Sequence, residues 1–123
     1  MSPDPTGRPS PEKSGEDAGR DVYDALTDAL LYDPAIGRST MMGYPCVRLA
    51  GQFLASYDAT SGLVVKLPAA QVSELVDAGT GVPFAPAGKV FREWVALPTV
   101  DRDLWRDLLD EAVAFARASL ERR

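Results

Sequence analysis

Four basic residues in the middle of the sequence are the first candidates for chemistry, because lysine and arginine side chains bind phosphate oxygens. One interpretation is a local nucleic-acid-binding patch. The other is that they are ordinary solvated charges and that nearby Trp94 is buried between the sheet and the C-terminal helix. The net charge of −5 favours the second, since an acidic chain does not attract a polyphosphate over long range. The four residues are Arg38, Lys66, Lys89 and Arg92.

Three aspartates form a second candidate group. Asp24 and Asp28 lie three and seven residues after Asp21, which places the three aspartates near one stripe of a helix. Such a stripe could attract a divalent cation or a basic partner, but Ca²⁺ normally takes six to eight oxygens on an adaptable loop. Amphipathic helices carry such stripes routinely. We therefore interpret the row as a solvated helix face.

The sequence lacks histidine and has a single cysteine. Histidine–metal sites, serine and cysteine triads and thiolate clusters are therefore excluded, and neither common glycine-rich phosphate loop is present. Cys46 has no histidine to activate it, so we expect a half-buried structural thiol. Met41 and Met42 could border a groove but are more often core residues. We expect no catalytic residue, no metal site and no cofactor, and hence a protein that is not an enzyme.

The 123 residues suffice for one domain, and 46% of them are hydrophobic, as a packed core requires. Residues 1–19 are rich in proline, glycine, serine and charge, so we predict a disordered tail before a domain at 20–123. The sequence shows neither a signal peptide nor an apolar run near the ~20 residues of a membrane helix. With one cysteine and hence no internal disulfide, these features predict a cytoplasmic protein.

Helical periodicity begins at Arg20 and must end at Asp33-Pro34, because a residue before proline leaves helical geometry. Three short apolar runs then predict a meander of strands at Pro45–Leu49, Gln52–Tyr57 and Leu63–Leu67. Ser39–Gly43 either adds a fourth strand or leads into the first. Alternating residues should share one buried face. They are Val47, Leu49, Phe53, Ala55 and Tyr57.

The second half of the sequence predicts a short helix from Pro68 to a glycine cap at Gly79. Two strands should follow at Val82–Ala85 and Arg92–Leu97. The last helix should run from a capping Asp101 to about Leu120. The predicted fold is a single α+β domain with an antiparallel sheet, in the order α-β(3)-α-β(2)-α.

Several motifs occur in the order seen in a known superfamily. They are a hairpin centred on Gly51, a lysine–leucine–proline strand end, a proline-rich turn with Gly88-Lys89 before a tryptophan-bearing strand, and a closing amphipathic helix. In this order, over about residues 20–120, the chain resembles MmcQ/YjbR-like proteins and TfoX N-terminal domains.

The resemblance implies an α-β(3)-α-β(2)-α architecture akin to the secretion-chaperone-like fold. It implies no catalytic residue. TfoX relatives are associated with regulation of competence, and YjbR relatives are often labelled DNA-binding. We expect this chain to lack the second domain of full-length TfoX proteins. We therefore expect a binding or regulatory module that acts through protein contacts, with a protein partner or as a homo-oligomer. The alternative is a nucleic-acid-binding accessory protein that uses the basic residues.

Overall fold

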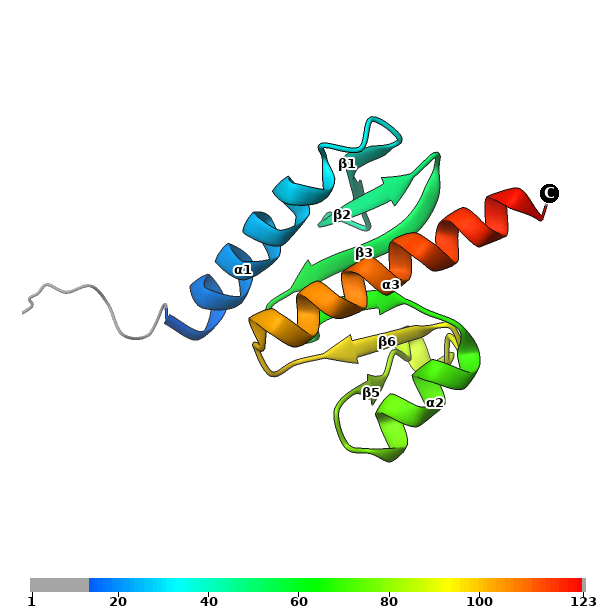
Figure 1. The fold of residues 1–123 in the computed structure, drawn as a ribbon. Helices are drawn as coiled ribbons and strands as arrows, with labels where there is room; N and C mark the ends of the chain where they lie inside the picture. Colours follow the sequence, from blue (N-terminus) through cyan, green and yellow to red (C-terminus); the bar gives the residue numbers. More distant parts are fainter. Residues whose placement is uncertain (1–13, 123) are drawn as a thin grey trace, which may run out of the picture.

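The structure is a computed structural model that describes residues 14–122. Within this range, three α-helices pack with a six-stranded antiparallel sheet, which confirms the predicted α+β class (Figure 1). The helices are α1 (Ser14–Leu30), α2 (Ala69–Asp77) and α3 (Arg102–Glu121). The strands are β1 (Ile36–Met41), β2 (Tyr44–Leu49), β3 (Gln52–Asp58), β4 (Gly62–Lys66), β5 (Val82–Pro83) and β6 (Trp94–Leu97).

The strands lie in the order β1-β2-β3-β4-β6-β5. The first four form a meander, and the chain then passes through α2 before β6 pairs with β4 and β5 closes the far edge. The predicted three-strand meander therefore has a complete additional strand, β1. Met42 and Gly43, both with positive φ, form the two-residue turn between β1 and β2, as tight hairpins require.

The core lies between the sheet and the helices. Helices α1 and α3 cross the same face of the sheet, which we call the helix face, and α2 lies beside β5 and β6 (Figure 1). Trp105 of α3 and Tyr23 of α1 are fully buried there. The predicted cap of α3 is confirmed, because the Asp101 carboxylate accepts a hydrogen bond from the Leu104 N–H at 3.1 Å.

Helix α1 begins earlier than predicted. The predicted tail covered residues 1–19, but residues 14–19 are helical, and residues 1–13 lie outside the described residues. Buried Tyr23 and Leu26 fix the helix on the sheet, and each preceding residue can then add a hydrogen bond at little cost. Gly19 is itself buried, and a Cβ there would meet the Tyr57 Oη at 2.5 Å. The folded domain therefore includes the last residues of the predicted tail.

The segment between α2 and β6 is less regular than predicted. Gly79 has φ +77 and its N–H donates to the Val76 carbonyl, which confirms the predicted glycine cap. Strand β5 stops at Pro83 rather than at Ala85, and a short 3₁₀ turn follows at Pro86–Gly88. Proline has no N–H to donate to a sheet, so the chain leaves the ladder here.

Candidate binding surface on the outer face

A β-bulge decides which side chains line the face of the sheet away from α1 and α3, which we call the outer face. The register between β2 and β3 shifts between Val47 and Arg48, so that Leu54 has no partner in β2. The extra residue reverses the alternation of side chains. Phe53 therefore lies on the outer face and stacks on Trp94. The prediction of one face for Val47, Leu49, Phe53, Ala55 and Tyr57 is wrong for Phe53.

Trp94 is the centre of an aromatic cluster on the outer face. Its ring stacks on Phe53 and Phe84, with centroid distances of 4.1 and 5.4 Å. Phe91 packs edge-on against it at 5.0 Å. The prediction that Trp94 is buried under the C-terminal helix is wrong. Its neighbour Val95 points into that core, so Trp94 must point to the opposite face, where it is only half-buried.

An apolar hollow of about 320 Å³ lies between α2 and the segment that leads into β6, and we call it the edge groove. Its apolar side chains come from Val72 and Val76 on one side and from Val90, Phe91 and Trp94 on the other. Ser73, Asp77 and Arg92 also line it. The edge groove thus offers apolar contact together with one acid, one base and one hydroxyl that can orient a bound chain.

A larger hollow of about 520 Å³ lies on the outer face, and we call it the outer trough. Met41, Met42 and Tyr44 line one side, and Phe84 and the prolines around it line the other. Met42 has 75% of its surface exposed, so the prediction that the methionine pair belongs to the core is wrong for Met42. The turn of the β1–β2 hairpin holds its side chain in solvent.

The four predicted basic residues do not form one patch. Arg38 forms an ion pair with Asp28 beside α1, on the helix face. Lys66, at the end of β4, is the register partner of Trp94. The Lys89 ammonium lies 5.9 Å from the centre of the Phe91 ring, and Arg92 lines the edge groove. Three of the four therefore surround the aromatic cluster, and none of these three has an ion-pair partner among residues 14–122.

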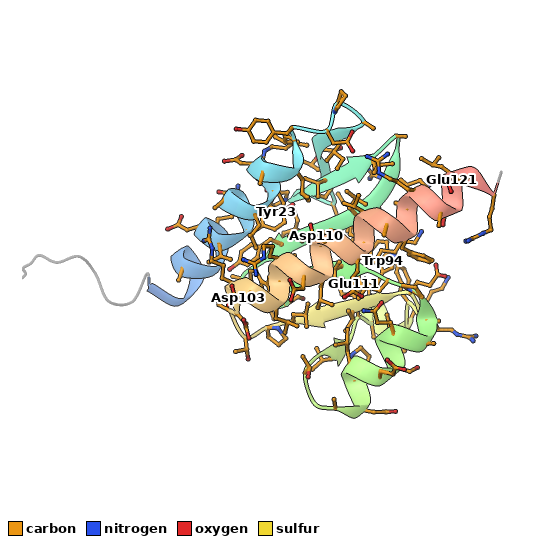
Figure 2. The ribbon with its side chains drawn as sticks, in the orientation of Figure 1. Tyr23, Trp94, Asp103, Asp110, Glu111 and Glu121 are labelled. Atoms are coloured by element: carbon orange, nitrogen blue, oxygen red, sulfur yellow. The ribbon has the colours of Figure 1, made fainter. Side chains whose placement is uncertain are left out.

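The predicted acidic row is a solvent-facing surface of α1. Asp24 pairs with Arg20 at 3.0 Å, Asp28 pairs with Arg38, and Asp21 is exposed. The part of the chain that the structure describes contains no group of three acidic, cysteine or histidine side chains placed to hold a metal ion. Further acids follow the exposed side of α3 (Figure 2). They are Asp103, Asp107, Asp110, Glu111 and Glu121, all but Asp107 labelled in Figure 2.

Two buried groups lie outside these hollows. Cys46 was predicted to be half-buried, but it has only 1% of its surface exposed. The side chain of Tyr23 projects from α1 towards the sheet, where burial raises the pKa of its hydroxyl (Figure 2). Its oxygen has no hydrogen-bond partner among the described residues. Neither residue lines the edge groove or the outer trough, so both act as core residues.

Sequence reasoning missed the aromatic cluster. Its signal is the spacing of Phe84, Phe91 and Trp94 within one short, proline-bearing segment, where regular strands would not be expected to bury all three.

Comparisons with protein-family models, with curated proteins and with solved structures found no match. No helix between residues 14 and 122 has both the length and the apolar character needed to cross a membrane.

Proposed function

We propose that this chain is a small, non-enzymatic binding module that recognises an apolar segment of a partner protein with the edge groove and the outer trough. One observation carries the proposal. Four of the six exposed large apolar side chains of the described residues line these two hollows: Met42, Tyr44 and Val82 line the trough, and Val90 lines the groove. Covering exposed apolar surface of this kind with a partner lowers the free energy and so favours binding.

The types of residue support a protein partner. Tryptophan, tyrosine, methionine and arginine are enriched where proteins bind one another, and Trp94, Tyr44, Met42 and Arg92 all lie at the hollows. Methionine adapts its shape to different ligands. Pro83 lines both hollows, so an extended segment could continue from one into the other. We infer that apolar side chains of the partner fill the hollows and that its backbone follows the rim.

The polar groups of the trough support binding rather than catalysis. The Asp58 carboxylate accepts hydrogen bonds from the Thr60 and Ser61 N–H groups at 2.9 and 2.8 Å. Its Oδ1 therefore stabilises the turn after β3, which supports a structural role for this carboxylate.

Selection of short peptides from a displayed library tests the proposal. We expect wild-type protein to enrich peptides with apolar anchor residues. Val90→Asp should weaken binding of the selected peptide at least about tenfold, since it places a charge in the groove. Val100→Asp is the matched control, because Val100 is also exposed but lines neither hollow. Equal loss in both variants, or no enriched peptide, would contradict the proposal.

A second candidate function rests on a separate observation. Lys66, Lys89 and Arg92, which have no ion-pair partner within residues 14–122, surround an aromatic cluster, and such a combination suits single-stranded nucleic acid. The overall charge of −5 and the acids on α1 and α3 oppose it. We rank this function second.

We also propose that the chain is a cytoplasmic member of the MmcQ/YjbR-like superfamily. The support is the order of its elements, which differs from the order that the resemblance implies only by the additional strand β1. The single, buried Cys46 is compatible with a reducing compartment.

A further inference from the structure

Strand β1 is one edge of the sheet, and no residue between 14 and 122 pairs with its outer side. Met41 and Tyr44 flank the two-residue turn and so exchange hydrogen bonds, and bonding alternates along an antiparallel pair. The Ala50 N–H donates to the Ala35 carbonyl, as this alternation requires. The N–H and C=O groups of Arg38 and Thr40 are therefore left facing away from β2.

This edge lacks most of the features by which proteins usually protect an edge strand. Those features include proline, charged side chains, a bulge and a covering segment, and only one of them, a single charge, is present here. The residues Ile36–Met41 include no proline or lysine, and their pairing with β2 is regular. The one charged side chain, Arg38, is held towards α1 by Asp28. The edge is thus open to a further strand.

The two ends of β1 are complementary in shape. A hollow of about 280 Å³ lies at the Gly37 end, where a Cβ on Gly37 would meet no atom within 4 Å. Met41 and the exposed Met42 project at the other end. An antiparallel neighbour of the same sequence would bring its methionine end to the glycine end of this strand. Self-complementarity of this kind is what a two-fold symmetric interface requires.

We propose that β1 pairs with β1 of a second copy of this chain, antiparallel and with Ser39 opposite Ser39. In this register Arg38 of one copy faces Thr40 of the other, so every outward N–H and C=O of these residues finds a partner. Met41 of each copy then lies opposite Gly37 of its neighbour. A shift of the pairing in either direction would require Ile36 or Met42 as a hydrogen-bonding partner. The Ile36 N–H already donates to the Asp33 carbonyl, and Met42 belongs to the turn. The shifted registers therefore leave some of the outward N–H and C=O groups unpaired.

The charges near the axis tolerate this arrangement. The two Arg38 side chains lie on the helix face close to each other, but each is already paired with Asp28 of its own chain. The dimer therefore places two ion pairs side by side rather than two free cations. The six-stranded sheets join into one continuous sheet, and the two outer troughs, each bordered by Met41, become neighbours. A dimer could thus bind two segments of one partner.

A cross-linking experiment on the full chain tests the register. Ser39→Cys is made in a Cys46→Ala background, because Cys46 is the partner of Ser39 within the hairpin and would otherwise compete. In the proposed register the two Ser39 residues form a non-hydrogen-bonded pair. The Cα atoms of such a pair lie about 4.5 Å apart, within reach of a disulfide. Under mild oxidation we expect a species of twice 13.2 kDa on a non-reducing gel. It should form roughly tenfold faster or more than with the matched control Thr80→Cys, because pairing raises the effective thiol concentration.

Light scattering on the unmodified chain gives the second readout. We expect a concentration-dependent rise from 13.2 kDa towards twice that mass. Ser39→Lys places two like charges opposite each other and should weaken the dimer at least about tenfold, whereas Thr80→Lys should not. Circular dichroism checks that both lysine variants fold. If Ser39→Lys does not fold, the cross-linking rates of the cysteine variants decide whether the dimer forms through β1. A monomer at all concentrations, or a dimer that neither cross-links at residue 39 nor responds to Ser39→Lys, would overturn the proposal, as would pairing of β1 with a different protein only.

Discussion

At the scale of single residues, the two tryptophans have different roles. Trp105 is fully buried between α3 and the sheet, with its ring 6.3 Å from that of Tyr57. Trp94 is half-buried on the outer face among Phe53, Phe84 and Phe91. A sequence gives both the same hydrophobicity, and only the packing of β6 distinguishes them.

Truncation of each tryptophan should show this difference. Trp105→Ala leaves a cavity in the main core and should cost about 3–5 kcal/mol of unfolding free energy. Trp94→Ala removes a side chain that water already reaches, so about 2 kcal/mol is expected from the smaller apolar area lost. Urea unfolding followed by circular dichroism measures both. An equal loss would mean that the aromatic cluster is a second core rather than a binding surface.

The Tyr23 hydroxyl should make stability depend on pH in the alkaline range. Burial raises its pKa above the ordinary value of about 10, so the folded protein holds its proton more tightly than the unfolded chain. Its contribution is complete below about pH 10 and is lost as pH rises above that value. Tyr23→Phe should therefore lose less stability than wild type above pH 10. At pH 7 it should be as stable or slightly more so, because an unpartnered buried hydroxyl is removed.

Chemical denaturation at pH 7 and at pH 10.5 measures this effect. Tyr32→Phe is the control, since Tyr32 is 92% exposed and its removal should change neither value. A Tyr23→Phe variant that is clearly less stable at pH 7 would show that the hydroxyl makes a hydrogen bond that stabilises the fold.

At the scale of the elements, most of the order could be predicted because periodicity and turn residues determine it locally. The helix of Val22 and Leu26, the hairpin at Gly51 and the cap at Asp101 each have a signal within a few residues. Strand β1 had only the open alternative at Ser39–Gly43, because its exposed residues are glycine, arginine, serine and threonine and show no apolar alternation. The bulge at Leu54 could not be predicted from the sequence either, because it depends on the pairing between β2 and β3.

The N-terminal boundary can be located by truncation. Removing residues 1–13 should leave the melting temperature within a few degrees, because their composition offers almost no apolar side chain for packing. Removing residues 1–19 should lower it by about 5 °C or more, because the first turns of α1 and the contact of Gly19 with Tyr57 are lost. Thermal unfolding of the two truncated chains distinguishes them. A large loss in the shorter truncation would show that the first thirteen residues contribute to the fold.

At the scale of the whole molecule, the charged residues of the two faces differ in their pairing. Acids and arginines on the helix face form ion pairs, such as Asp24 with Arg20 and Asp28 with Arg38. Lys66, Lys89 and Arg92 lie around the outer aromatic cluster and have no ion-pair partner among residues 14–122. Sequence reasoning identified these bases but could not separate them from Arg38, which is distant from the cluster. It did not predict the edge groove or the outer trough, because each forms between segments whose contact depends on tertiary packing.

The central claim is that the outer face binds by apolar contact rather than through phosphate groups. Titration of the selected peptide, of labelled duplex DNA and of single-stranded DNA over a range of salt concentrations tests it most directly. Apolar binding should change little with salt, and we predict no detectable binding of either DNA at physiological salt.

Phosphate binding by Lys66, Lys89 and Arg92 would give a different result. Three neutralised phosphates release counterions, so log affinity would fall against log salt with a slope of about −3 for duplex and about −2 for single strands. Tight DNA binding with such a slope, abolished by Lys89→Ala and Arg92→Ala, would contradict the account. A peptide affinity that is unchanged in Lys89→Ala and lost in Val90→Asp is the result that the account predicts, because Lys89 lines neither hollow.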